Sequence, residues 1–268
     1  MRHFLVILAF VFCTSAFSQK DFPFREGERV TYTVYYNLAW IWVDAAVVEF
    51  SVSDAIYQNN SVFFFKSKGY SKPNYDWIYT VRDTFTSFAS KKDISPLWYK
   101  RNTKEGSHIV NNYYLFSQSE KKVFSYLRDS NEDEISDTLS FKAPLYDVLS
   151  ASYFFRSVDF ENKKIGDTIS INTIMDNEFV QINVVYLGEE LLEHKNKRRY
   201  PTYKFKTKAV GGSVFDEDSE IVVWISKDKN RIPLKVQSEI LVGSVIAYIS
   251  TVENPKDKTS EIIKDFIK

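Results

Sequence analysis

The chain has 268 residues with 35 basic and 35 acidic side chains, so its formal net charge at neutral pH is zero. With no basic excess to neutralise phosphates, nucleic acid is not an expected partner. The single cysteine rules out a disulfide framework within the chain, and the few scattered glycines form no phosphate-binding loop.

The first residues have the three parts of a secretory signal peptide. A basic start precedes an apolar run (residues 4–12), and the small residues Ala16 and Ser18 stand where signal peptidase requires them. The apolar run is too short to span a bilayer. We therefore expect cleavage after Ser18 and export to the periplasm or outer envelope. The mature chain would have no transmembrane segment and no thiol, because Cys13 leaves with the signal peptide.

A period of two dominates the rest of the chain, which predicts β-strands. In residues 28–36, for example, Val30, Tyr32 and Val34 share one face. Further segments rich in aromatic and β-branched residues follow at 42–52, 61–70, 77–88, 108–116, 121–127, 167–175, 178–187, 202–210, 220–226, 232–240 and 244–250. Short turns separate most of them. The pattern predicts a mainly β protein, a large antiparallel meander that forms a barrel or a curved half-barrel.

The segment after Pro144 changes to helical spacing, with Leu145, Val148 and Leu149 on one face. It predicts one helix near residues 145–157 that packs on the sheet or plugs it. No linker interrupts the mature chain, so residues 19–268 are expected to form a single β-rich domain. Its C-terminal tail should form a short helix or fray.

Residues 220–240 (EIVVWISKDKNRIPLKVQSEI) predict a hairpin. Trp224 stands in the first strand and is interpreted as a packing anchor. In the turn, Asp228 is expected to bind nearby backbone and Asn230 to adopt a left-handed conformation. Pro233 cannot donate to a strand ladder, so it is expected at the start of the second strand.

Few residues suggest metal or nucleophilic chemistry. Once the signal peptide is removed, His108 and His194 are the two histidines, and their spacing matches no zinc motif. His194 lies in a basic stretch that predicts a solvated turn. No G-x-S-x-G elbow is present. We expect no metal site and no cofactor.

Aromatic residues make up 16% of the chain and form the strongest functional signal. Trp40, Trp42, Tyr75 and Trp77 gather in the first half and are candidate ligand-binding residues. Aromatic faces stack on sugars, and aromatic-lined cavities hold acyl chains. The alternative is that these side chains fill an ordinary β core.

Tyr153 and Arg156 are one helical turn apart and are the candidates for catalysis. In a polysaccharide lyase, a tyrosine can act as the base while a cation stabilises the developing enolate. The alternative is that these residues join the helix to the sheet by a hydrogen bond or an ion pair.

Several stretches together resemble the bacterial family called domain of unknown function 3108. FREGERVTYTVYY resembles its G-E-x-L-x-Y-x-V opening, and YDVLSASYFFRS resembles its D-x-L-S-x-x-Y-x-x-R segment. VVWISKDKNRIPLKVQSEILVGSV resembles its W-x-S-x-D-x-x-R-x-P closing hairpin. The resemblance covers roughly residues 24–252 and implies no catalytic residue, because the family's activity is unknown. The closing hairpin is also loosely similar to that of LolA/LolB-type lipoprotein carriers, which implies a curved half-barrel.

These observations favour an exported cell-envelope protein that binds a lipid, a glycan or another amphipathic ligand on an aromatic-lined sheet without catalysis. Two alternatives stay open. One is a lyase-like, polysaccharide-active enzyme. The other is a structural or interaction module of envelope biogenesis with an envelope protein as its partner.

Overall fold

The computed structural model describes residues 21–38, 41–77, 79–130, 134–209, 219–240 and 243–268. The first eight strands are β1 (Arg29–Leu38), β2 (Ile41–Tyr57), β3 (Asn60–Ser71), β4 (Arg82–Ser90), β5 (Pro96–Glu105), β6 (His108–Ser117), β7 (Lys122–Asp129) and β8 (Ile135–Ser140). The helix α1 (Val148–Arg156) follows them. The remaining strands are β9 (Thr168–Met175), β10 (Glu178–Glu193), β11 (Arg199–Lys208), β12 (Glu220–Ser226), β13 (Pro233–Glu239) and β14 (Ser244–Glu253). Two short 3-10 helices are η1 (Pro73–Tyr75) and η2 (Ile263–Asp265).

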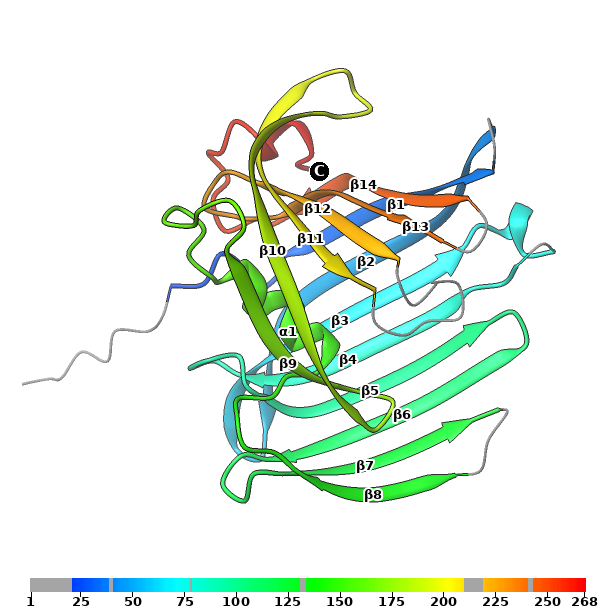
Figure 1. The fold of residues 1–268 in the computed structure, drawn as a ribbon, viewed down its shortest axis with the longest axis vertical. Helices are drawn as coiled ribbons and strands as arrows, with labels where there is room; N and C mark the ends of the chain where they lie inside the picture. The colour runs from blue at the N-terminus through cyan, green and yellow to red at the C-terminus, as the bar shows by residue number, and fades with distance from the viewer. Residues whose placement is uncertain (1–20, 39–40, 78, 131–133, 210–218, 241–242) are drawn as a thin grey trace, which may run out of the picture.

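All fourteen strands belong to one antiparallel sheet in the order β8-β7-β6-β5-β4-β3-β2-β1-β14-β13-β12-β11-β10-β9. Every neighbouring pair is consecutive in the chain except β1 and β14, which join the two meanders. The edge strands β8 and β9 are not paired with each other, so the sheet is curled but open (Figure 1). The predicted antiparallel meander is confirmed, in its half-barrel rather than its closed form.

The helix α1 connects the two edges of the sheet and lies on its concave side (Figure 1). It packs against β3 and β4 on one side and β9 on the other. The helix confirms the sequence prediction for residues 145–157. The N-terminal segment joins it there, because the Phe24 ring meets the ring of Tyr153 at 4.9 Å and Tyr153 stacks on Phe65 at 4.0 Å.

A bulge in β2 reverses the faces of its side chains. The pairing with β1 skips Ala45. The period of two in residues 42–52 predicts that Trp42 shares a face with Val48 and Phe50. The extra residue instead places Trp42 on the convex face, whereas Val48 and Phe50 face α1. The predicted face of Trp42 is therefore wrong, because a bulge leaves no mark on the hydrophobic pattern.

Two strands were not predicted, β5 and β8. In β5 the segment PLWYKRNTKE carries four charged residues, and its end, with Gly106 next, has the composition of a turn. β8 is a six-residue edge strand with mostly exposed side chains, and Asp137 separates its two apolar residues, Ile135 and Leu139, so its pattern is weak. Conversely, the strand predicted for 77–88 begins only at Arg82, as β4. The 3-10 helix η1 lies shortly before it in the chain.

The C-terminal tail is anchored to the sheet rather than frayed. Ile262, Ile263 and Phe266 are buried in the same apolar cluster as Trp224. The N–H of Val252 in β14 donates to the carbonyl of Phe266 at 2.7 Å. Of the predicted alternatives for the tail, the short helix is therefore the better description.

Candidate functional site

The start of α1 is fixed by Asp147. One oxygen of its carboxylate accepts the N–H groups of Leu149 and Ser150 at 2.8 and 2.9 Å, and the Ser150 hydroxyl accepts the Asp147 N–H at 3.0 Å. This is a capping box, which satisfies backbone donors that a helix start leaves free. The Ser87 hydroxyl in β4 donates to the other oxygen at 2.7 Å. Burial raises the pKa of Asp147 to about 6, although these hydrogen bonds oppose the rise.

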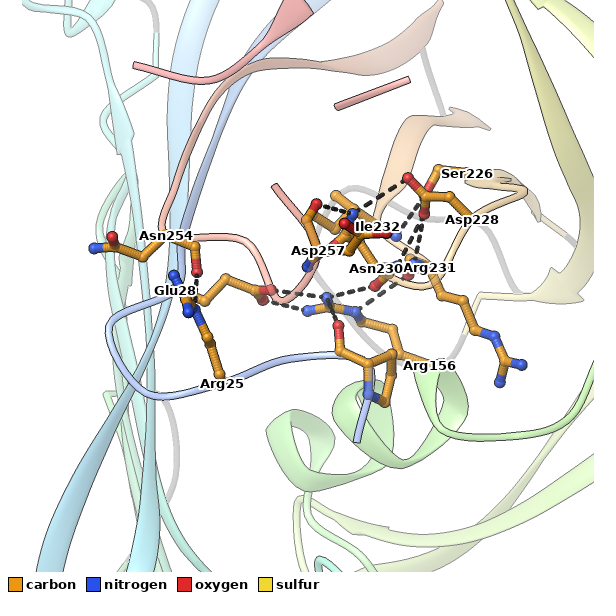
Figure 2. Close-up of polar contacts among 11 residues, drawn as sticks. Arg25, Glu28, Arg156, Ser226, Asp228, Asn230, Arg231, Ile232, Asn254 and Asp257 are labelled. Atoms are coloured by element: carbon orange, nitrogen blue, oxygen red, sulfur yellow. Dashed lines mark hydrogen bonds and ion pairs between the residues drawn. The ribbon is translucent and has the colours of Figure 1, made fainter. Parts of the chain in front are cut away.

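The end of α1 is fixed by Arg156, which is 7% exposed. Its guanidinium forms a two-pronged ion pair with Glu28, at 2.6 and 3.2 Å, and Glu28 is 1% exposed. It also donates to the carbonyls of Pro23 at 3.2 Å, Asn230 at 2.8 Å and Arg231 at 3.2 Å (Figure 2). All three guanidinium nitrogens are therefore engaged. Arg156 joins the N-terminal segment, the helix and the β12–β13 turn.

The β12–β13 turn is organised by Asp228, as predicted (Figure 2). Its Oδ1 accepts the N–H groups of Asn230 and Arg231, both at 3.0 Å, and the hydroxyl of Ser226 at 2.7 Å. The left-handed residue is Arg231, with a φ of 46°, and not Asn230. The prediction of a left-handed Asn230 is therefore wrong. The side-chain amide of Asn230 instead exchanges two hydrogen bonds with the backbone of Asp257, at 2.7 and 2.9 Å.

A partly enclosed cavity of about 370 Å³ lies between α1 and the concave face of β1, β2 and β12–β14. Nearly all of its surface is apolar. The helix contributes Ser152, Tyr153, Phe155 and Arg156, and the sheet contributes Val30, Tyr32, Val48, Phe50, Val223, Ile225, Pro233, Val236 and Ala247. Such a volume and lining are typical of small-molecule sites. The cavity exists because the ends of α1 are fixed to groups beside it.

Four of the lining side chains are polar, and two of them already use their donor groups. Arg156 is engaged as described, and the Ser152 hydroxyl donates to the carbonyl of Val148 at 2.8 Å. The other two are Tyr32 and Tyr153, which are 6% and 3% exposed. No hydrogen bond joins either phenol to another residue in the described part of the chain. Burial raises the pKa of both phenols far above its usual value, and the nearby Glu28 carboxylate adds to the rise.

The three predicted ligand-binding aromatics that the structure describes lie away from this cavity. Trp40 falls outside the described residues. Trp42 is 48% exposed and Trp77 is 82% exposed, while Tyr75 is half-buried in η1. None of these three lines the cavity. Their role in ligand binding stays a prediction, and the cavity draws its aromatic rings from other positions.

The two residues predicted for catalysis, Tyr153 and Arg156, lie close together, but their contacts hold the helix in place. The guanidinium carbon of Arg156 lies 5.6 Å from the centre of the Tyr153 ring. The raised pKa of Tyr153 makes it a poor base at neutral pH, and Arg156 already pairs with Glu28. The geometry favours the alternative stated for this pair, an ion pair that joins the helix to its surroundings.

The histidines form no site. His108 pairs with Asp129 at 2.7 Å. His194 is 7% exposed and packs edge-on against the rings of Tyr248 and Phe266, so the predicted solvated position is wrong. The anchored C-terminal tail covers it, and burial lowers the pKa of its ring. Among the residues that the structure describes, no group of three or more His, Cys, Asp or Glu side chains could hold a metal ion.

Glu28 and the cavity itself were missed at the sequence level. Glu28 lies 128 positions from its partner, and nothing local marks an acidic residue as buried. One signal was present, however. The three motifs that carry the family resemblance supply Glu28 and Tyr32, then Asp147, Tyr153 and Arg156, then Asp228, Arg231 and Pro233. Four of these residues line the cavity, namely Tyr32, Tyr153, Arg156 and Pro233. Glu28 and Arg231 lie beside Arg156 and bond to it (Figure 2).

A family model described as "Protein of unknown function (DUF3108)" matches residues 31–250. No curated protein matches the chain. Among solved structures, the chain is similar to a beta-barrel-like protein of domain of unknown function DUF1849 from Brucella abortus. The TM-score is 0.54 at 9% identity, covering 86% of this chain and 98% of that chain. At that identity the likeness shows the fold alone, a barrel-like β structure. No described helix has the length and hydropathy needed to cross a membrane.

Proposed function

Because the chain belongs to the DUF3108 family of proteins of unknown function, its activity must be argued from its own geometry, and we propose that it binds an amphipathic small molecule. On this proposal it is an exported cell-envelope protein that acts without catalysis. The ligand occupies the cavity between α1 and the concave face of the sheet. The observation that carries the proposal is the apolar cavity of about 370 Å³.

The lining favours a lipid-like ligand over a glycan. A sugar carries many hydroxyl groups, and each one buried without a partner costs free energy. Two phenols without a described hydrogen-bond partner line the cavity, and nearly all of the remaining lining surface is apolar, which matches a molecule with an apolar body. At roughly 30 Å³ per group, the volume of one water in the liquid, 370 Å³ holds on the order of a dozen non-hydrogen atoms. A single acyl chain fits that space, whereas the several chains of a lipoprotein anchor do not.

A lyase-like activity receives less support from the same residues. A lyase needs a base that is unprotonated at neutral pH and a cation that is free to meet the substrate. Tyr153 holds its proton tightly, and the charge of Arg156 is compensated by Glu28. The position of these groups therefore supports binding rather than proton abstraction.

The test is to purify the full chain from its own envelope without detergent and to measure retained small molecules by native mass spectrometry. Two variants sharpen it. Val48→Trp places a large ring inside the cavity, whereas Val47→Trp places the same ring on the convex face, because neighbouring strand residues point to opposite sides.

We expect a bound apolar molecule, or uptake of an added apolar fluorophore, in the natural protein and in Val47→Trp. Val48→Trp should lose most of it. Binding that survives equally in Val48→Trp would place the ligand elsewhere, and no binding at all would reject the proposed function.

A further inference from the structure

The cavity has a polar end beside α1. Tyr32 reaches it from β1 and Tyr153 from the helix, next to the ion pair of Glu28 and Arg156. The phenols interact electrostatically with that pair and with each other. The other lining residues that the structure describes are apolar, except for Ser152, whose hydroxyl is already bound to the helix backbone. The polar group of a ligand can therefore find hydrogen-bond donors at this end of the cavity, from Tyr32 and Tyr153.

The charges at this end cancel. Arg156 could attract an anion, but all three of its nitrogens already donate to Glu28 and to three backbone carbonyls. An anionic head placed here would lose its hydration, meet the Glu28 carboxylate and find no free cation. A cationic head would compete with Arg156 for Glu28. The phenols that remain are neutral hydrogen-bond donors.

Building on the proposed function, we propose that the ligand is an uncharged single-chain amphiphile. Its hydroxyl or carbonyl head accepts hydrogen bonds from Tyr32 and Tyr153, and its chain runs along Val48, Val236 and Ala247. Free fatty acids and phospholipids are disfavoured by their charged heads. Long-chain alcohols, monoesters and amides belong to the favoured class.

The experiment compares decan-1-ol with decanoate, which have matched chains and differ in head charge. Binding to the full-length mature protein is measured by titration calorimetry at pH 8, below the concentrations at which either compound aggregates. We expect decan-1-ol to bind at least about tenfold more tightly, because burying an unpaired carboxylate is costly.

The double variant Tyr32→Phe/Tyr153→Phe tests the head contact. It keeps both rings and removes only the hydroxyls, which bind no described residue, so folding should be retained. Decan-1-ol binding should weaken about threefold to tenfold, the usual effect of losing one or two hydrogen bonds. Tyr35→Phe is the matched control. Tyr35 pairs with Asp44 on the convex face, so this change should leave binding unaltered.

The outcomes distinguish a failure of the neutral-head inference from a failure of the proposed function. Equal binding of both compounds, or tighter binding of decanoate, overturns the neutral-head inference while the proposed function stands. An unchanged affinity in the double variant overturns the role of the phenols. Failure of both compounds to bind, together with no retained ligand, rejects the proposed function itself.

Discussion

Replacing Arg156 by methionine tests how far the floor of the cavity depends on one side chain. The change leaves the Glu28 carboxylate, 1% exposed, without its partner. Breaking a buried ion pair in this way costs roughly 3–5 kcal/mol. Arg156 also donates to the carbonyls of Pro23, Asn230 and Arg231, and each buried acceptor left without a donor adds about 1 kcal/mol or more. We expect the free energy of unfolding to fall by at least about 5 kcal/mol.

The assay is urea-induced unfolding followed by tryptophan fluorescence and circular dichroism. The matched control is Arg199→Met. Arg199 pairs with Glu193 at 3.5 Å, and both side chains are more than half exposed, so its loss should change the free energy by less than about 1 kcal/mol. The double change Glu28→Leu/Arg156→Met leaves no lone charge and should recover roughly 2 kcal/mol or more relative to Arg156→Met. If Arg156→Met cost no more than Arg199→Met, the assigned role of the ion pair would be refuted.

Three further predictions rest on separate features. Because burial raises the pKa of Asp147 from its ordinary value of 3.8 to about 6, the folded chain keeps this proton to higher pH than the unfolded chain does, and stability should fall as pH rises from about 4 to 6. The full effect is on the order of 3 kcal/mol, and Asp147→Asn should flatten this part of a pH series of urea midpoints. Gly243→Ala should cost at least about 2 kcal/mol, because its Cβ would lie 2.0 Å from the Asn37 carbonyl oxygen, whereas Gly166→Ala meets no atom within 4 Å and should cost about 1 kcal/mol of backbone strain. Protein from the envelope fraction should begin at Gln19 by N-terminal sequencing, and an uncleaved N-terminus would contradict the predicted signal peptide.

The features predicted from sequence are those encoded by local patterns. The helix α1 was found from its apolar spacing, although it begins after the cap residue Asp147 and not at Pro144. The β12–β13 hairpin was found because Asp228 and Pro233 mark its turn. Strand β8 was missed because it is short and Asp137 interrupts the face that carries Ile135 and Leu139. Local patterns also cannot show what a distant segment covers, which is why His194 was assigned to solvent although the C-terminal tail buries it.

The candidate site was harder to predict because its members meet only after folding. Tyr153 and Arg156 were singled out from helical spacing, but their role depends on Glu28, which arrives from the other end of the chain. The aromatic clusters suggested Trp42 and Trp77, yet exposure and the bulge in β2 place both outside the cavity. Richness in aromatic residues identifies a β protein with large side chains, and it does not say which rings enclose a space.

The buried ion pair and the open volume beside it are connected. The apolar cavity is only partly enclosed, but its lining side chains still lack packing partners on one side, which favours movement of α1 into the space. A helix held only by apolar contacts could shift and close the space, because such contacts have no preferred direction. Arg156 resists that shift through directional bonds to Glu28 and to two separate backbone segments, and Asp147 resists it at the other end. These polar anchors therefore fix both ends of α1 beside the open space, and under the proposed function a ligand of matching shape would supply the packing contacts that the helix does not.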